Sequence, residues 1–264
     1  MKTKLAIVGC GNMASAIVLG LAKKSKAFDF VTYTPTQTRA KNLAQAVGGK
    51  AAKEIKELQP CEYFLIACKP QQYDEMAAQL KIAMHAEAKI ISVVTGISTP
   101  HIQKTLGVTQ VARAMPNTPC LIGEGTCAIF FTALSDKEKT IVENIFSAVA
   151  QVFLVDSDDA IDASTAVIGS GPAYIFEIAR ILAKKYAALG IEPAAAEKIV
   201  QQVIRGSAHL MQQSADTPET LREQVTSKGG TTFAALEIFR SRGFEEILDA
   251  AVDAAYQRAK QLSR

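Results

Sequence analysis

The sequence from residue 5 reads Leu5-Ala6-Ile7-Val8-Gly9-Cys10-Gly11-Asn12-Met13-Ala14. Its apolar first part is typical of a buried strand, and the rest matches the pattern Gly-x-Gly-x-x-Ala at the start of a helix. Gly9 permits a tight turn, Gly11 lets the backbone approach a pyrophosphate, and the small Ala14 lets the helix pack closely on the strand. Unpaired N–H groups at the helix N-terminus attract the anion. A purely structural turn is the alternative to the dinucleotide site that this pattern predicts. The expected cofactor contacts are Val8, Gly9, Cys10, Gly11, Asn12 and Met13.

The first half of the chain alternates strand-like apolar runs with helical patterns. The expected strands are 5–8, 30–33, 63–67, 89–94, 110–114 and 127–131, and the expected helices are 13–24, 36–47, 73–84, 99–106 and 136–149. Such alternation is typical of a parallel sheet covered on both faces. Beyond residue 156 only helical patterns remain, at about 173–189, 193–213, 218–225, 231–242 and 244–262. We predict an α/β fold, with a Rossmann-type doubly wound sheet in residues 1–156 and an all-helical domain in residues 157–264.

The helix expected at 173–189 is apolar almost all round, because Glu177, Arg180 and Lys184 leave only a narrow polar stripe. Such a helix needs neighbours on several sides. A helical domain of about 110 residues can hardly bury so much apolar surface alone. We expect homodimerisation through this domain, and the alternative is the central helix of a monomeric bundle.

Composition excludes several classes of protein. The 264 residues are 48% hydrophobic and 21% charged, unlike a disordered chain. The net charge of +3 is too small to indicate a nucleic-acid partner. No apolar run approaches the ~18 residues of a membrane span, and the N-terminus does not read as a secretory signal. The five cysteines and three histidines lack the spacing of a standard metal site. A cytoplasmic enzyme with reduced thiols fits best.

The end of the second expected strand bears on the choice of nicotinamide cofactor. An NAD-preferring site places Asp or Glu there to accept from the ribose 2′-hydroxyl, but residues 31–39 contain neither. Thr34 and Thr36 can donate hydroxyl hydrogen bonds to a 2′-phosphate, and Arg39 adds positive charge. We therefore expect NADP(H) to be preferred, with NAD(H) possible, although threonines are also ordinary turn residues.

Three more loops follow expected strands, where open α/β sheets bind ligands. They contribute Lys69 and Pro70, Thr95, and Asn117 as expected cofactor contacts. A solvated lysine at position 69 and a structural turn around Pro116 and Pro119 are the alternatives.

A second glycine loop lies in the helical half and reads Thr226-Ser227-Lys228-Gly229-Gly230-Thr231-Thr232. Its glycines can adopt positive φ and expose successive backbone N–H groups at a helix N-terminus, which suits a small anion such as a carboxylate. A helix cap alone needs a single Ser or Thr. We expect substrate contacts from Ser227, Gly229, Gly230, Thr231 and Thr232, with a structural cap as the alternative.

Five stretches together resemble the pyrroline-5-carboxylate reductases, and the resemblance spans nearly the whole chain. They are Gly9-Cys10-Gly11-Asn12-Met13, Lys69-Pro70, Arg113-Ala114-Met115-Pro116-Asn117-Thr118-Pro119, Gly169-Ser170-Gly171-Pro172-Ala173-Tyr174 and Val225-Thr226-Ser227-Lys228-Gly229-Gly230-Thr231-Thr232. Lys228 departs from the proline found in many members, and Val94-Thr95-Gly96 departs from their usual Ala-Ala-Gly.

This resemblance implies reduction of 1-pyrroline-5-carboxylate to proline by NAD(P)H, the last step of proline biosynthesis. It also implies a helical domain that dimerises, with further assembly into decamers in some members. It assigns the substrate carboxylate to the Gly-Gly-Thr-Thr loop, contact with the ring nitrogen to the Thr232 hydroxyl, and a place near the nicotinamide to Gln224. A protonated imine accepts hydride without a metal ion, so catalysis rests on holding the reactants in place. Thr232 is the expected catalytic residue.

Two other functions fit parts of the sequence. A β-hydroxyacid dehydrogenase shares the two-domain plan, but Lys184-Lys185 lacks the Lys-x-x-Asn pattern that this class needs. An NADP-binding redox sensor would keep the first glycine loop and have no reason to keep the second.

Overall fold

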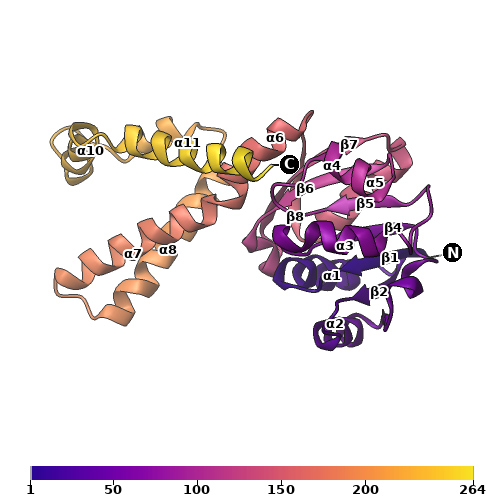
Figure 1. Cartoon of the computed structure of the whole chain (residues 1–264). Helices are drawn as coiled ribbons and strands as arrows, with labels where there is room; N and C mark the ends of the chain where they lie inside the picture. The colour runs from indigo at the N-terminus through magenta and orange to yellow at the C-terminus, as the bar shows by residue number, and fades with distance from the viewer. Residues whose placement is uncertain (1, 264) are drawn as a thin grey trace. The chain divides into compact units, whose positions relative to one another are not determined.

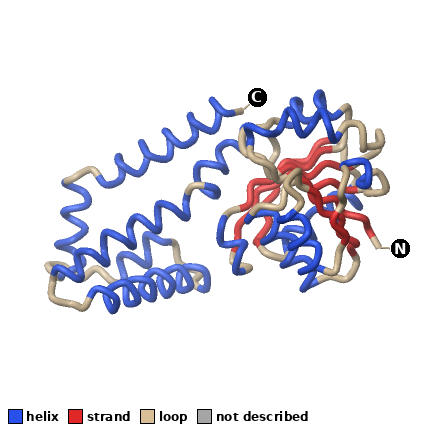
Figure 2. Tube along the Cα trace, turned by 60° about the horizontal axis from the view of Figure 1, so that its bottom comes forward, coloured by secondary structure: helices blue, strands red, loops and turns tan. Residues whose placement is uncertain are grey.

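The computed structural model describes residues 2–263. It divides into two compact units, one formed by residues up to Pro172 together with those from Ala254 onward, the other by Ala173–Asp253. The first unit holds all the strands, and the second unit is helical (Figures 1 and 2).

The first unit is built on an eight-stranded sheet with the order β3-β2-β1-β4-β5-β6-β7-β8. The strands are β1 (Thr3–Val8), β2 (Phe28–Tyr33), β3 (Lys50–Ala51), β4 (Tyr63–Ile66), β5 (Lys89–Ser92), β6 (Val111–Pro116), β7 (Gly125–Thr132) and β8 (Ala150–Leu154). All neighbours are parallel except β6 and β7. The expectation of a wholly parallel sheet was therefore wrong at this pair. Residues 117–124 are too few for the crossover that a parallel connection needs.

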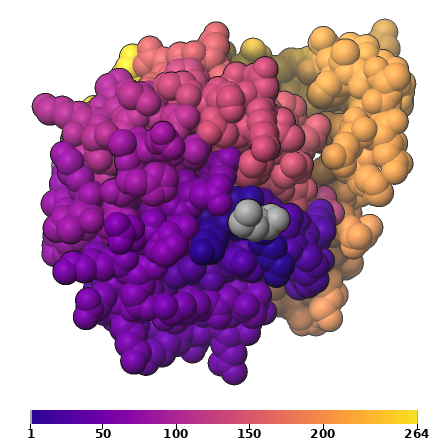
Figure 3. Space-filling view, turned by 90° about the vertical axis from the view of Figure 1, so that its right-hand side faces the viewer, coloured from indigo at the N-terminus to yellow at the C-terminus, as the bar shows by residue number. Residues whose placement is uncertain are grey.

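Helices cover both faces of the sheet, as expected for a doubly wound fold. Alternate residues of β1 point to opposite faces: Leu5 and Ile7 belong to one apolar core, and Ala6 and Val8 to the other. The first core contains residues of α1 (Asn12–Lys24), α2 (Thr38–Val47) and α5 (Asp136–Ser147), and the second contains residues of α3 (Tyr73–Leu80) and α4 (Thr99–Leu106). Short 3-10 turns occur at η1 (Ile55–Leu58), η2 (Pro70–Gln72) and η3 (Thr118–Ile122). In Figure 3 the indigo-to-magenta atoms of this half of the chain form a continuous surface.

One continuous helical run follows the sheet, and the sequence analysis predicted only its last part, at 173–189. It comprises α6 (Asp158–Ser164), a π-helical turn at Thr165–Gly169, and α7 (Gly171–Ala188). Within the π turn the Ser170 N–H donates to the Thr165 carbonyl at 3.0 Å. Ile161 of α6 packs with Met115 and Ala128 of the sheet. The stretch at 169–174, one of the five that carry the family resemblance, thus lies within this helical run.

The continuity of α6 with α7 also changes the expectation about membrane spans. Because α6 and α7 join, residues 158–188 form one run that is long and apolar enough to cross a membrane by length and composition.

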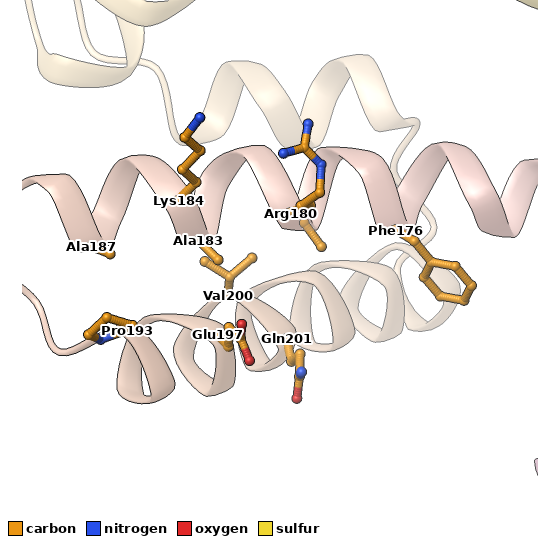
Figure 4. Close-up of a pocket in the computed structure, with 10 residues that line it drawn as sticks. Phe176, Arg180, Ala183, Lys184, Ala187, Pro193, Glu197, Val200 and Gln201 are labelled. Carbon is orange, nitrogen blue, oxygen red and sulfur yellow. The ribbon is translucent and has the colours of Figure 1, made fainter.

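The second unit has almost no buried core of its own. It comprises most of α7, α8 (Pro193–Gln213), α9 (Pro218–Gln224), α10 (Thr231–Ser241) and the first part of α11 (Phe244–Leu262). Among its residues only Ala196 and Val200 are buried. Large apolar side chains are exposed along every long helix, among them Phe176, Ile181, Leu182, Val203, Leu210, Phe239 and Ile247. A groove of about 460 Å³ runs between α7 and α8, with Phe176 at one end (Figure 4).

The last turns of α11 belong to the first unit rather than the second. Ala259 is buried, and Leu262 lies so close to Gly96 that a Cβ on Gly96 would stand 2.7 Å from the Leu262 carbonyl oxygen. Gly96 has φ +73°, which favours glycine in any case. The loop after β5 therefore requires glycine at this position.

Candidate functional site

The turn after β1 has the geometry that its glycines predict. Gly9 has φ +93°, and a Cβ there would stand 2.8 Å from backbone atoms of Ala67 and Cys68. This contact brings together the loops at the carboxyl ends of β1 and β4, which are neighbours in the sheet. The strand order reverses at this pair, and open α/β sheets bind ligands at such a switch point.

The N-terminus of α1 is free of any side-chain cap. Its N-cap is Gly11, in an extended conformation, with no side-chain hydrogen bond. By contrast, Ser98 caps α4 and Ser157 caps α6 through hydroxyl groups. The first N–H groups of α1 have no partner within the helix, and no Cβ covers Gly11. This arrangement fits a pyrophosphate.

Cys10 sits inside this turn with its thiol turned into the protein. The Sγ atom donates to the Tyr33 carbonyl at 3.8 Å, and burial raises the pKa of the thiol to about 11. Cys10 thus offers a ligand its backbone rather than a reactive thiolate.

The end of β2 holds an unpaired buried hydroxyl. Thr34 is buried and its Oγ1 has no hydrogen-bond partner, whereas Thr36 and Arg39 are exposed. A buried hydroxyl without a partner at this edge of the sheet suits a hydrogen bond to a ribose or to a phosphate attached to the ribose.

Gln37 shapes the same turn and was missed by the sequence analysis. It has φ +60°, and its Nε2 donates to the carbonyls of Thr34, Ala52 and Lys53 at 3.2–3.3 Å. Positive φ in a residue other than glycine gives no signal in the sequence.

The remaining expected cofactor contacts of the first unit also follow strands. Lys69 is exposed in extended backbone just before Pro70, and Thr95 is half-buried in the loop after β5. Asn117 is buried, and its Oδ1 accepts from the Thr126 N–H at 2.9 Å. The Asn117 side chain therefore braces the chain between β6 and β7, and its carboxamide oxygen is already paired.

The second glycine loop precedes α10 as expected. Gly229 has φ +73°, and Gly230 is the extended N-cap of α10 with no side-chain cap. The Gly230 N–H donates to the Ser227 carbonyl at 3.0 Å, so the donors that face outward are those of Thr231 and Thr232 and their hydroxyls. A Cβ on Gly230 would stand 2.5 Å from Ser227 Oγ. This close approach explains the second glycine of the pair.

Gln224 is the last residue of α9 and precedes the second glycine loop. Its Nε2 donates to Asp216 Oδ2 at 2.9 Å, and Ser227, Gly229 and Thr231 are exposed. The expected substrate residues thus lie within one loop and one helix N-terminus. Both candidate anion sites are helix N-termini that begin after glycine, one in each unit. Among residues 2–263, no three His, Cys, Asp or Glu side chains gather in a way that could hold a metal ion.

The chain matches two family models. Residues 158–262 match the model for pyrroline-5-carboxylate reductase dimerisation, and residues 4–96 match a model for coenzyme F420-dependent NADP oxidoreductases. The apolar run at 158–188 falls inside the first of these. Its exposed side chains are therefore those of a dimerisation domain.

Relatives match along the full length. The pyrroline-5-carboxylate reductase of Haemophilus influenzae is 32% identical over 98% of this chain and 97% of its own. The structure of a pyrroline-5-carboxylate reductase from Coxiella burnetii is 30% identical, covers 100% of both chains and has a TM-score of 0.90. The Plasmodium falciparum pyrroline carboxylate reductase, solved with NADP bound, has the same fold at 23% identity, with a TM-score of 0.84 over 99% of this chain and 98% of that one.

Proposed function

The chain belongs to the pyrroline-5-carboxylate reductase family, and from that premise we propose that it reduces 1-pyrroline-5-carboxylate to L-proline as the last step of proline biosynthesis. The observation that carries the proposal is the N-terminus of α10, which begins after Gly230 without a side-chain cap and is surrounded by hydroxyl groups. A carboxylate is the anion that this amide-rich site, with Lys228 in the same loop, fits best.

The nicotinamide cofactor would supply hydride to the imine carbon. Hydride addition to the protonated imine moves the C=N electron pair to the ring nitrogen and gives the neutral secondary amine directly. That nitrogen then takes up one further proton to give the ammonium form of proline. The N–H groups of Thr231 and Thr232 hold the substrate carboxylate, and the Thr232 hydroxyl orients the ring nitrogen and assists proton delivery. Most of the rate acceleration comes from this positioning.

We further propose that NADP(H) is preferred, with NAD(H) as the alternative cofactor. The turn after β1 and the uncapped N-terminus of α1 would hold the pyrophosphate through Gly9, Gly11 and Asn12. The unpaired Thr34 hydroxyl and the exposed Thr36 and Arg39 are donors that suit a 2′-phosphate, and no carboxylate lies among residues 31–39 to repel it. The NADP in the Plasmodium falciparum structure supports the same choice.

The assembled form is a homodimer in this proposal, and a decamer is a possible higher assembly. The exposed apolar helices of the second unit support it, since a second copy can cover them. We propose the division at residue 156 as the functional one, with the cofactor bound before it and substrate binding after it. All five cysteines are free, which suits the reducing conditions of the cytoplasm.

One assay tests the reaction. Purified protein is mixed with NADPH and 1-pyrroline-5-carboxylate, and the absorbance of the reduced nicotinamide is followed; the measurement is repeated with NADH. We expect turnover with both and a higher kcat/KM with NADPH. Absence of turnover with either cofactor would contradict the proposed function and favour a non-catalytic NADP-binding protein.

A substitution tests the role of Thr232. Thr232→Val removes the hydroxyl at nearly constant volume, and we expect kcat to fall by about 10²-fold while the Kd for NADPH stays within twofold. Thr231→Val is the matched control one residue away, and we expect it to retain more activity. Equal turnover of wild type and Thr232→Val would remove this hydroxyl from the mechanism.

A further inference from the structure

A charged network is buried in the first unit, outside the residues expected to bind cofactor or substrate. Arg113 of β6 has a side chain only 1% exposed. Its Nη1 donates to Asp158 Oδ1 at 2.7 Å and to the Asp158 carbonyl at 3.1 Å, and its Nη2 donates to Asp162 Oδ1 at 2.5 Å. Both carboxylates lie on α6. The network therefore binds the first turns of that helix to the middle of the sheet.

Asp158 also reaches a third element, at the start of α4. Thr99 N–H donates to Asp158 Oδ1 at 3.0 Å and to Oδ2 at 3.2 Å, and the Thr99 hydroxyl donates to Oδ2 at 2.5 Å. Thr99 is 3% exposed and the Asp158 side chain 23% exposed, so these bonds are only partly accessible to water. Charge-assisted hydrogen bonds of this kind are about twice as strong as neutral ones.

Thr99 directly follows the loop at residues 93–98. This loop carries the expected cofactor contact Thr95. The loop begins at the carboxyl end of β5, where Ser92 pairs with Arg113. Its middle is fixed by the close approach of Gly96 and Leu262. Its end is fixed by Asp158, which accepts from the first N–H of α4, while Ser98 accepts from the His101 N–H. The Thr99 hydroxyl adds a further hydrogen bond to Asp158 at the point where the loop meets the helix.

We propose that Asp158 is a positioning residue that sets the loop at 93–98 for cofactor binding, with Arg113 fixing the direction of its carboxylate. The proposal rests on the proposed function, because Thr95 is expected to face the nicotinamide cofactor. Asp162 shares Arg113 but makes no contact with Thr99. Asp162 therefore attaches α6 to β6 through Arg113 and does not position the loop at 93–98.

The test compares variants that cut different arms of the network. Thr99→Val removes the bond from the hydroxyl at nearly constant volume, Thr99→Ser keeps it, and Asp162→Asn weakens the arm that does not reach the loop. Cofactor affinity is measured by NADPH fluorescence, kcat by steady-state kinetics, and Tm by calorimetry. We expect Thr99→Val to raise the Kd for NADPH about tenfold with kcat at saturation within twofold. Thr99→Ser restores the wild-type Kd, and Asp162→Asn lowers Tm while leaving the Kd within twofold.

Hydrogen exchange gives a second readout that does not depend on turnover. The amides of residues 95–99 exchange faster in Asp158→Asn than in Asp162→Asn if Asp158 holds the loop. If Thr99→Val and Asp162→Asn both lower Tm but leave the Kd and the loop's exchange at wild-type values, the network is a purely structural staple and the proposal is wrong. A wild-type protein that binds neither NADPH nor NADH overturns the proposed function, and this inference with it.

Discussion

Gly9 and Gly11 differ in how much space a side chain would find in the same turn, and alanine substitutions should therefore differ in their effect on stability. A methyl group on Gly9 meets backbone atoms at 2.8 Å in a region of positive φ, whereas one on Gly11 meets nothing within 4 Å. We expect Gly9→Ala to lower the free energy of unfolding by about 3 kcal/mol. Gly11→Ala should cost no more than about 1 kcal/mol, yet weaken NADPH binding, because its methyl group occupies the space of the pyrophosphate.

Urea unfolding and a cofactor titration of the two variants separate these effects. Equal NADPH affinity in Gly11→Ala and wild type would show that the pyrophosphate does not approach this turn.

The buried Cys10 thiol makes stability depend on alkaline pH. Its pKa is about 11 in the folded protein against an ordinary 9.0, so its neutral form is favoured by burial. That stabilisation is complete below about pH 9 and is lost as the pH rises through about 11, where the unfolded chain ionises first. We expect Tm to fall over this range, and less steeply in Cys10→Ala. An unchanged slope in that variant would assign the effect to other groups, such as Cys61 and Cys68, whose pKa values are also raised to about 11.

Residues whose role is local could be predicted from the sequence, and residues whose partners are distant could not. The positive φ of Gly9 could be predicted, because it is a glycine in a Gly-x-Gly-x-x-Ala pattern directly after a strand. Arg113 and Asp158 are 45 positions apart in the sequence. No residue near either one in the sequence indicates that the two side chains form a pair. A charged residue in the apolar run of β6 was the one available signal.

Among the elements, α5 begins with a capping box that offers a clean measurement. Ser135 and Glu138 exchange hydrogen bonds with each other's backbone, and Glu138 also pairs with Lys89 at 3.2 Å. We expect Ser135→Ala to lower the free energy of unfolding by about 1 kcal/mol, because it leaves N–H groups of the first turn unpaired. Lys137→Ala, at an exposed position of the same turn, is the control and should change it by less than about 0.5 kcal/mol. A loss of similar size in both variants would argue against the cap.

Elements with strong periodicity and clear terminal residues were predicted well. The bounds of α4, α8 and α11 match the expected ones, and Ser135 is the N-cap of α5 as predicted. The sequence analysis missed β3, which has two residues, and β8, whose short apolar run at 152–154 begins only two residues after the helix expected at 136–149. It also missed α6 and the π turn at Thr165–Gly169, since Gly169, Gly171 and Pro172 are typical of the start of a new helix and not of the interior of a continuous one.

At the scale of the whole molecule, the exposed apolar side chains of the second unit predict self-association. Phe176 on α7 is 64% exposed and lines the groove beside α8 (Figure 4). We expect Phe176→Asp to weaken the dimer by at least tenfold in sedimentation equilibrium, because it places a charge in an apolar interface. Ile82→Asp is the control, since Ile82 is equally apolar and 74% exposed but lies in the first unit. A dimer weakened equally by both changes would place the interface elsewhere.

The docking of the last turns of α11 onto the first unit has a consequence for biosynthesis. The ribosome releases the sheet-forming residues first, but the turn that lies against Gly96 emerges only after residues 97–253 have been translated. Until then the loop beyond β5 lacks one of its supports. The strands of the sheet can therefore pair before the loop beyond β5 has gained the support that the last turns of α11 give it.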